Sequence, residues 1–565
     1  MTMADNRIGN IDKMGGGGDA QTSPMSGLAS YLKNCWVRWA FVLSCTALAV
    51  LVPHGHGTIP TLAIGFIAAF LTAALLTFRF ALLEKIFETV VRWQILLAAV
   101  FAFVAAFNFY GNFCWTFHMG IELGVLPDKL EAFSGPVYVL AGLAAIIAAP
   151  AAFVFLYAFI SRFVPIVKEG IQKSDTVEKC FFIVGGLILS ATLLVLYHTT
   201  TAFYGMPANL IYGSDTHLLV EQNFWMNINA GQNDLRRPLF GLYAMPFALV
   251  ATLLSYVLFF IPNLYLISLG IIQVVLALVC AILLGRMLHL ETCSKIFFLT
   301  AFLLSYPLLV FFILLEKYIF STFWLILFLH TVMFRRHHRD AFFIGATGSM
   351  LTSGFFFFLL SEATNWKNWL MDMIMSGLKL LVVITLFGQL AVVLTAVDRF
   401  HYLQQWGGGT LTLYEKFLVF INFIQGCFMT LPSEIDFQHH FPVYELTTVQ
   451  SLNLIALLFL LWVITGFFLN AKDRFAQICF SWVVASFLIL CIGGWGTAEN
   501  SMMLYTVYFG WAYFCLAFLA IEKSLQKLPT VKCVVYTMCI AVLAYINIPG
   551  FYDLIQFGIK YYPHP

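Results

Sequence analysis

Long apolar segments recur along almost the whole chain. After a polar, glycine-rich stretch over residues 1–33, which we expect to be a disordered cytoplasmic tail, they follow one another with mostly short polar connections. About 20 apolar residues in a helix are enough to cross the hydrocarbon core of a bilayer. Only 10% of the 565 residues are charged, against roughly 25% in a soluble domain. Because lipid offers the backbone no hydrogen-bond partners, the sequence predicts an all-α polytopic membrane protein.

About fifteen segments are long and apolar enough to cross a bilayer as helices. They occupy residues 36–53, 59–78, 93–112, 134–160, 180–203, 263–284, 294–313, 318–334, 341–361, 370–397, 413–432, 448–469, 475–495, 501–521 and 531–549. We therefore expect additional helices over 34–179, a helical core over 180–520, and a last helix with a short extracytoplasmic tail over 521–565.

The distribution of lysine and arginine orients these predicted helices, because loops on the cytoplasmic side of a membrane carry an excess of both. One side receives most of them: Lys33, Arg38, Arg79, Lys85, Arg92, Arg162, Lys168, Lys173, Lys179, Arg286, Lys295, Arg335, Arg336, Arg339, Arg399, Lys472, Arg474, Lys523, Lys527 and Lys532. That side and the N-terminus are predicted to be cytoplasmic, and a long loop over 204–262 is predicted to be extracytoplasmic. The assignment requires that residues 239–260, which contain Pro246, lie along or dip into the outer leaflet instead of crossing it.

The stretch from Tyr212 to Phe240 is a long polar connection and carries the residues best suited to chemistry. A charged loop of that length at a membrane face is typical of catalysis or recognition. Asp215 follows a predicted span, where partial desolvation would raise its proton affinity and make it a better general base. The sequence also allows Asp215 to cap the helix that follows it, and the two roles can coexist.

Two neighbouring arginines close this loop. Arg236 and Arg237 stand before Pro238 on the predicted outer side, where positive charge is unusual. Guanidinium groups bind phosphate and diphosphate through paired hydrogen bonds, so we expect an anionic ligand here; the alternative is that the arginines anchor the loop to lipid headgroups. Asp234, in the same loop, is a further candidate for substrate binding.

Other polar residues are predicted at the same membrane face. Glu316 and Lys317 interrupt an apolar run, and an ionisable pair in such a place is a functional candidate, although an ordinary tight turn with a solvated pair would explain it too. Glu499 and Asn500 precede the predicted helix 501–521, where they either bind substrate or cap the helix.

No cofactor or metal site is expected from the sequence, although the sequence does not exclude that a divalent cation binds. The twelve cysteines are scattered, mostly within apolar runs and without CxxC spacing. Adjacent His439 and His440 have no third ligand at metal spacing, and Walker A, GxGxxG and Gx[ST]xG motifs are absent. The net charge of +2 provides no basic surface for a nucleic-acid partner.

The order of these features resembles that of the GT-C superfamily, polytopic glycosyltransferases that use lipid-phosphate-linked sugars. In that superfamily a span leads to a long extracytoplasmic loop with an acidic residue near its start. A Pro-Leu-Phe-like motif, an interfacial helix and a span ending in a short basic turn follow. The corresponding residues here are Asp215, Arg237 to Phe240, 241–260, and 263–284 ending at Arg286. The resemblance covers 180–520 and departs from the family pattern in two ways: four spans come first, and Asp215 stands alone where relatives often have paired acids.

The resemblance implies that 180–520 is a catalytic core that transfers one sugar, with inversion, from a polyprenyl-phosphate donor. The acceptor would be a glycan, a lipid or a protein outside the cytoplasm. It implies that Asp215 takes the proton from the acceptor hydroxyl, and that Arg236, Arg237 or Lys317 stabilises the departing lipid phosphate.

The resemblance further implies that Glu316 and Glu499 orient sugar hydroxyls or an activating cation. It favours an integral, multi-pass location in a bacterial plasma membrane, with the active face extracytoplasmic and membrane lipids around the helices.

Two other classes of protein compete with this interpretation. A transporter or flippase of lipid-linked saccharide often carries ionisable residues near mid-span and has internal repeats. We find no convincing repeat of the halves, and the polar residues are predicted at one face. A scaffold or assembly factor would explain the first four spans but would not explain the function of the charged loop, so we favour a glycosyltransferase.

Overall fold

The computed structural model describes residues 127–564 with gaps, and only scattered positions before residue 127. The gaps lie at 205–209, 222, 227–235, 335–338, 362–364, 387–410, 438–440, 448–451 and 497–501. The predicted tail over 1–33, and most of the predicted spans over 36–53, 59–78 and 93–112, fall outside the described residues.

Most described residues are helical, and they include one short hairpin that was not predicted. The helices are η2 (Asp128–Phe133), α6 (Ser134–Gln172), α7 (Thr176–Thr199), α8 (Thr216–Glu221), α9 (Phe240–Val257), α10 (Leu264–Met287), α11 (Thr292–Leu303), α12 (Tyr306–Ile313), α13 (Tyr318–Phe334), α14 (Arg339–Ser349), η3 (Leu351–Leu360), α15 (Trp366–Leu386), α18 (Leu413–Gly426), α19 (Leu454–Leu469), α20 (Arg474–Ser486), η4 (Phe487–Ile492), α21 (Met502–Ser524) and α22 (Pro529–Tyr561). Strands β1 (Ser433–Asp436) and β2 (Val443–Leu446) pair antiparallel, with Ser433 opposite Leu446.

Six of the described helices are long and apolar enough to cross a membrane, which makes this a helical membrane protein. They are α7, α9, α10, α20 continued by η4, α21 and α22, and the bent pair α11–α12 would be a seventh. The prediction of about fifteen spans is thus not confirmed by the described residues. Some predicted segments form shorter apolar helices, such as α13 and α19, and the segment 341–361 is divided between α14 and η3.

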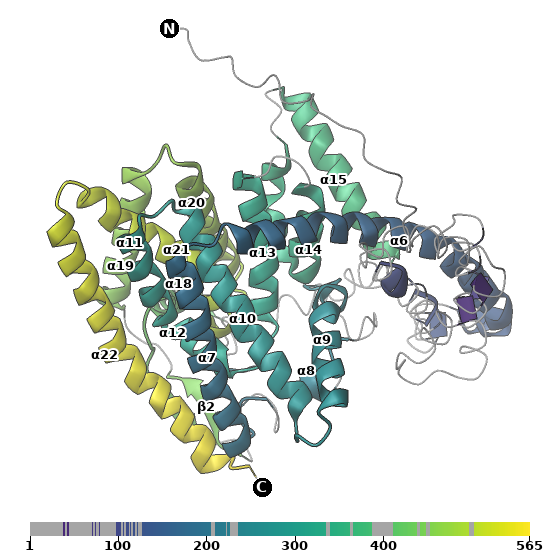
Figure 1. Ribbon diagram of the computed structural model, residues 1–565, viewed down its shortest axis with the longest axis horizontal. Coiled ribbons are helices and arrows are strands. Elements are labelled where there is room, and N and C mark those ends of the chain that lie inside the picture. The colour runs from purple at the N-terminus through teal and green to yellow at the C-terminus, as the bar shows by residue number, and fades with distance from the viewer. Residues whose placement is uncertain are drawn as a thin grey trace, which may run out of the picture.

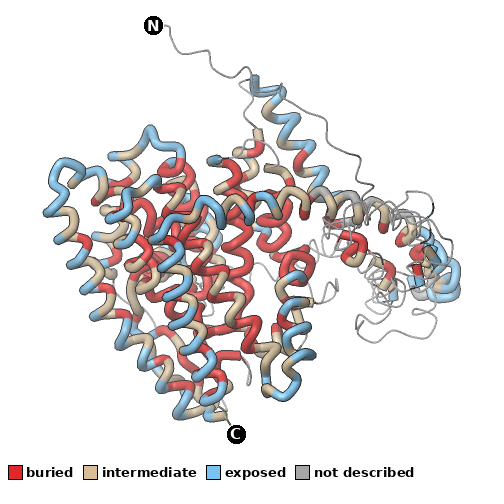
Figure 2. Tube along the Cα trace, in the orientation of Figure 1, coloured by how far each residue is buried: buried red, intermediate tan, exposed pale blue. Residues whose placement is uncertain are grey.

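The helices form a bundle around α10, α13 and α21. Buried residues concentrate in the middle of this bundle, whereas the outer sides of α15 and α22 are exposed (Figure 2). Helix α6 runs across the bundle at a steep angle to the other helices (Figure 1). The ring of Phe159 in α6 lies within 6 Å of the rings of Tyr243 in α9, Trp324 in α13 and Phe342 in α14.

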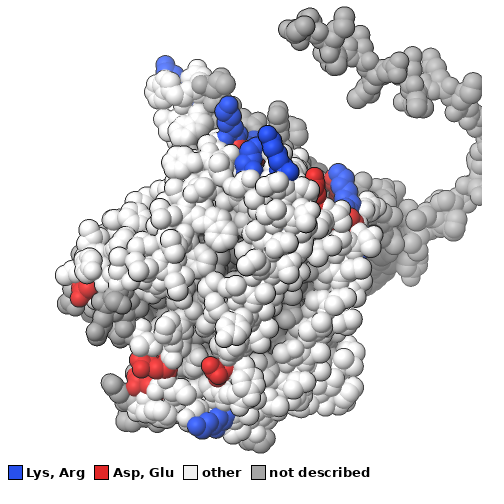
Figure 3. Space-filling view, turned by 90° about the vertical axis from the view of Figure 1, so that its left-hand side faces the viewer, with Lys and Arg blue, Asp and Glu red and all other residues white. Residues whose placement is uncertain are grey.

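One end of the bundle, which we call the basic end, is held by an ion-pair network. Arg286 at the end of α10 and Lys295 in α11 both pair with buried Glu178 in α7, at 2.5 and 3.1 Å. The Sγ atoms of Cys293 in α11 and Cys533 in α22 lie 3.8 Å apart. On the face shown in Figure 3, Lys and Arg gather at this end above a broad uncharged band.

The opposite end, which we call the loop end, brings together three distant segments. The backbone N–H of His564 donates to the carbonyl of Thr199 (2.9 Å), and its ring lies 3.3 Å from the side-chain amide of Asn263. Helices α7, α10 and α22 therefore run between the same two ends (Figure 1).

Helix α9 has the length and composition of a span but follows the path of a re-entrant segment. The chain leaves the loop end at Thr200, and α9 starts in the interior, where Leu239 and Phe240 are buried and the Leu239 N–H donates to the carbonyl of Gly348 (2.8 Å). From there α9 returns the chain to the loop end at Asn263. That residues 239–260 do not cross the bilayer stays a prediction, because α9 alone is long and apolar enough to cross.

Helices α11 and α12 form one apolar segment that bends by 59°. Pro307 stands in the first turn of α12, and a proline there disfavours continuation of the preceding helix. The carbonyls of Leu304 and Phe428 both accept hydrogen bonds from the buried amide of Asn547 in α22, each at 2.8 Å. The bend leaves a backbone carbonyl without a partner in its own helix, and a side chain of another helix supplies the hydrogen bond.

Candidate functional site

The site is built on the turn over 314–317, which joins α12 to α13 and belongs to neither helix. The Glu316 N–H donates to Oε1 of Gln273 (3.0 Å), and Nε2 of Gln273 donates to the carbonyl of Leu314 (2.8 Å). Gln273 is buried in α10 and lies nine residues after its first residue, Leu264. Nine helical residues span about 13 Å, so the turn is recessed by that distance from the loop end of α10.

Glu316 and Lys317 are both buried in this turn, at 0% and 4% exposure. The solvated tight turn considered for this pair is therefore wrong. Oε2 of Glu316 accepts the Lys317 N–H (3.0 Å), and Oε1 accepts the N–H of Asp215 (3.0 Å). One carboxylate thus connects the turn to the loop that carries Asp215.

Asp215 faces Lys317 across a 3.0 Å salt bridge, formed by its Oδ2 and Nζ of Lys317. The Asp215 side chain is 37% exposed, whereas that of Lys317 is 5% exposed. The backbone of Asp215 also opens α8, because its carbonyl accepts the N–H of Leu219 (3.1 Å). Asp215 therefore precedes a helix, as one interpretation predicted, while its side chain points toward the cation.

A strained turn places Asp215. Tyr212 has φ of 51° and Gly213 has φ of 66°, and the left-handed region is uncommon for a bulky residue such as tyrosine. The surroundings hold it there: the Tyr212 N–H donates to the carbonyl of Tyr444 in β2 (2.8 Å), and its hydroxyl lies 2.7 Å from that of Tyr306. Strain that packing maintains in this way is often found at functional sites.

The two arginines lie close to aromatic rings beside the same turn. The guanidinium of Arg237 is 4.8 Å from the centre of the Tyr318 ring, and that of Arg236 is 5.6 Å from Trp495. Arg237 is only 3% exposed, so for this residue an anchor to lipid headgroups does not fit. The carbonyl of Arg236 accepts the N–H of Leu351 (2.7 Å), which ties the segment to η3.

Burial and neighbouring charges together shift the pKa values of the site. Burial alone would raise the pKa of Asp215, but Lys317, aided by Arg237 and Arg236, lowers it to about 2. The expectation that the pKa of Asp215 is raised is therefore wrong. Burial and the repulsion from Arg237 lower the pKa of Lys317 to about 8, although Asp215 and Glu316 oppose this shift. Burial raises the pKa of Glu316 above its usual value.

The pKa values of both partners are lowered, but for different reasons: nearby cations lower that of Asp215, whereas burial first and then Arg237 lower that of Lys317. An excess of cations favours the carboxylate form of Asp215 and disfavours the ammonium form of Lys317. Such a site is suited to bind an anion.

The structure brings together Asp215, Arg236, Arg237, Glu316 and Lys317 of the residues chosen from the sequence. Asp234, Glu499, Asn500, His439 and His440 fall outside the described residues.

Sequence reasoning missed Gln273, which holds the turn, and Tyr318, which packs on Arg237. Gln273 did carry a signal, because it is a polar residue in the middle of an apolar segment. Tyr318 carried none, since the sequence is rich in aromatic residues throughout.

Among the described residues, no group of three or more His, Cys, Asp or Glu side chains is placed to hold a metal ion. Comparisons of the chain with protein-family models, with curated proteins and with solved structures found no match.

Proposed function

We propose that the protein is a membrane glycosyltransferase that moves one sugar from a polyprenyl-phosphate donor to an acceptor hydroxyl on the extracytoplasmic side. The observation that carries this proposal is the half-exposed carboxylate of Asp215, held 3.0 Å from buried Lys317 and near two arginines. A carboxylate and a cluster of cations at one point are what transfer from a phosphate leaving group requires: a proton acceptor and a site for the departing charge.

Lys317 and Arg237 are the proposed phosphate ligands, with Arg236 near the entrance. Lys317 and Arg237 are almost fully buried, and ionic hydrogen bonds are strengthened where water is excluded. The departing phosphate would gain most from these cations as its negative charge develops.

Asp215 is the proposed general base. Its pKa of about 2 makes it a weak base in the unliganded protein. A phosphate bound next to Lys317 would offset the cation that lowers this pKa, so donor binding would raise the proton affinity of Asp215. The base would thus become stronger when the donor is in place.

Glu316 is assigned a positioning role instead of the substrate contact inferred from the sequence, because it is fully buried and both of its oxygens accept backbone N–H groups. Asp234, Glu499 and Asn500 remain proposed substrate ligands on sequence grounds, for the sugar hydroxyls or the acceptor. A bacterial plasma membrane with the loop end outside is proposed as the location.

One observation favours a second candidate, a transporter or flippase of lipid-linked saccharide. The charged turn is recessed by about 13 Å from the loop end of α10 and directly follows the bent pair α11–α12. Transporters bind their substrates near the bilayer midplane, at interrupted helices of this kind.

A reconstituted assay distinguishes the two candidates. The purified protein in liposomes is given a radiolabelled polyprenyl-phosphate sugar and a membrane extract as acceptor, and product glycans are identified by mass spectrometry. We expect Asp215→Asn to lower the turnover rate by about 100-fold or more and Lys317→Gln to raise the KM for the donor. Glu221→Gln, which alters an exposed acid of the same loop, should leave both unchanged.

Transfer at the wild-type rate by Asp215→Asn would exclude this residue as the base. If the wild-type protein moves intact lipid-linked sugar across the bilayer and transfers no sugar to an acceptor, the glycosyltransferase proposal is wrong and the transporter proposal holds.

A further inference from the structure

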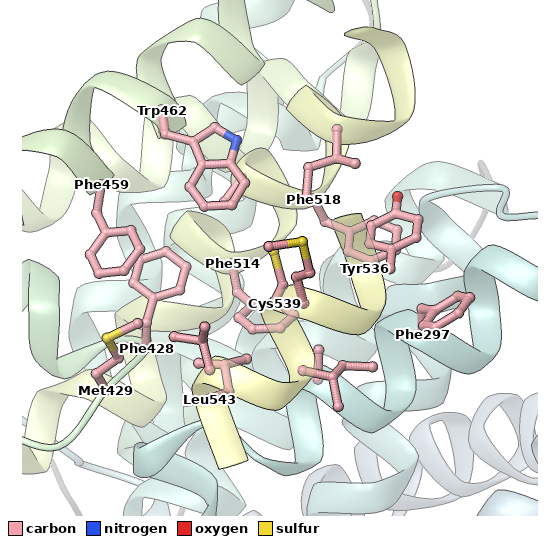
Figure 4. Close-up of a pocket in the computed structure, with 16 residues that line it drawn as sticks. Phe297, Phe428, Met429, Phe459, Trp462, Phe514, Phe518, Tyr536, Cys539 and Leu543 are labelled. Carbon is pink, nitrogen blue, oxygen red and sulfur yellow. The ribbon is translucent and has the colours of Figure 1, made fainter. Parts of the chain in front are cut away.

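An apolar cavity lies where α22 passes over α19 and α21, away from the charged turn. Its volume is about 230 Å³. Figure 4 shows aromatic side chains on both sides of it, with Phe459 and Trp462 of α19 on one side and Tyr536 of α22 and Phe297 of α11 on the other. Phe514 lies between them.

The cavity opens on a surface that faces lipid. Large apolar side chains of both neighbouring helices are exposed beside it, including Leu458 and Leu461 of α19 and Met538 and Val542 of α22. Helix α22 is the outermost helix on this side of the bundle (Figure 1). In a bilayer, acyl chains cover such a surface, so they are the molecules with direct access to the cavity.

The basic end of this cavity carries lysines. The Tyr536 hydroxyl donates to Glu522 (2.6 Å), and Lys532 pairs with the same carboxylate at 3.1 Å. Lys523 and Lys527, in and after the last turn of α21, are exposed close by. Three lysines and one glutamate therefore give this end of the cavity an excess of positive charge, and Figure 3 shows Lys and Arg gathered at this end of the bundle.

We propose that this cavity binds a glycerophospholipid with an anionic headgroup. One acyl chain fills the cavity between α19 and α22, and the phosphate lies against Lys523 and Lys527. The apolar walls offer water no hydrogen bonds, so an apolar chain suits them better. The volume is below the range of about 300–1,000 Å³ that holds a whole ligand, so the second chain stays in the bilayer.

The headgroup, not the chain, supplies the selectivity. Acyl chains have similar apolar surroundings in the bilayer and in the cavity, so their transfer alone distinguishes no lipid. Basic residues close to a membrane surface attract anionic lipids, each by enough to change binding several-fold. Two exposed lysines should therefore make an anionic lipid bind about tenfold or more tightly than a zwitterionic one.

Quenching of Trp462 tests this proposal. The protein is reconstituted with increasing fractions of phosphatidylglycerol or phosphatidylcholine whose acyl chains carry bromine, which quenches tryptophan on contact. The Trp462 signal is the difference between the wild type and Trp462→Phe. We expect phosphatidylglycerol to quench it at a roughly tenfold lower fraction than phosphatidylcholine does.

Three variants complete the test. The double variant Lys523→Gln/Lys527→Gln should abolish the difference between the two lipids, whereas Lys560→Gln, which removes an exposed charge from the loop-end half of α22, should preserve it. Ala517→Leu, which adds volume at the wall of the cavity, should reduce quenching by both lipids.

Equal quenching by the two lipids in the wild type would show ordinary boundary lipid only and would overturn the proposal. So would displacement of brominated phosphatidylglycerol by polyprenyl phosphate at a lower fraction than by unlabelled phosphatidylglycerol. Because the lysine variants change exposed side chains, they remain informative if Ala517→Leu fails to fold.

Discussion

At the scale of single residues, Lys317 gives the site its dependence on pH. Burial and the nearby Arg237 lower the pKa of Lys317 to about 8, close enough to neutrality for the ammonium to lose its proton under mildly alkaline conditions. Asp215, with a pKa of about 2, stays ionised throughout that range.

Lys317→Arg is therefore expected to change the alkaline limb of the pH profile. In the wild type, Lys317 loses its charge as the pH rises through about 8, so the KM for an anionic donor should rise there. Arginine keeps its charge at such pH values, so this rise should disappear in the variant. The KM for the donor, measured across that range for both proteins, checks the prediction. An unchanged alkaline limb in Lys317→Arg would assign it to another group.

The same shifts determine how the fold responds to pH. Asp215 has a lower pKa in the folded protein than the usual 3.8, so its contribution to stability is complete above that value and is lost as the pH falls through about 2. Lys317 also has a lowered pKa, and its charge therefore costs the folded state below about pH 8. That cost is relieved as the pH rises toward 10.5, the usual value for lysine.

The sequence identified the charged residues of the site but not their mutual effects. Asp215 was predicted from its place in the charged loop, Arg237 from its position on the predicted outer side, and Lys317 from its place in an apolar run. The predicted direction of the pKa shift of Asp215 was wrong because Lys317, which lowers this pKa, lies 102 residues away in the sequence. Nothing near Asp215 in the sequence indicates that contact.

At the scale of elements, the start of α9 depends on a close approach to α14. A Cβ added to Gly348 would lie 2.8 Å from Cδ1 and 2.9 Å from Cβ of Leu239. The Leu239 N–H also donates to the carbonyl of Gly348. Because Arg237 precedes Leu239 by only two residues, this contact determines where the arginine lies.

Gly348→Ala is expected to displace the start of α9. Overpacking of this kind costs about 1–3 kcal/mol, so the thermal unfolding midpoint of the purified protein should fall. The KM for the donor should rise as Arg237 moves with the helix. Gly354→Ala is the matched control, because a Cβ there meets only Thr347 Cγ2 at an ordinary 3.5 Å. Equal stability and equal KM in the two variants would contradict the assigned role of this contact.

Element positions followed the apolar pattern where a helix is bounded by polar residues. The segment predicted over 318–334 is α13 (Tyr318–Phe334). The last helix extends well beyond the predicted 531–549, because Pro549 is accommodated inside α22. The hairpin of β1 and β2 was not predicted, since each strand has only four residues, too few for a periodic pattern to be recognised.

At the scale of the whole molecule, the path of α9 determines which segments share a side of the membrane. Crossing by α9 would place Glu221 and Asn263 on opposite sides, whereas a re-entrant α9 leaves them on the same side. The described geometry favours the second arrangement, because the chain leaves and rejoins the loop end around this helix.

Cysteine labelling checks this topology. In a background with Cys180 and Cys293 changed to serine, the variants Glu221→Cys, Asn263→Cys and Glu291→Cys each place a thiol at an exposed position. We expect a membrane-impermeant maleimide added to intact cells to label the first two, and Glu291→Cys only after permeabilisation. Labelling of Glu221→Cys and Asn263→Cys from opposite sides would show that α9 crosses.

The bend between α11 and α12 also bears on the order in which the protein is made. The carbonyl of Leu304 at this bend accepts its hydrogen bond from Asn547, which is synthesised 243 residues later. Until α22 has entered the membrane, the Leu304 carbonyl faces apolar surroundings without this amide, at a cost of several kcal/mol, whereas the Phe428 carbonyl still accepts the Tyr306 N–H. We therefore expect the segment that presents Glu316 and Lys317 to reach its final conformation only after α22 has been released from the ribosome and inserted.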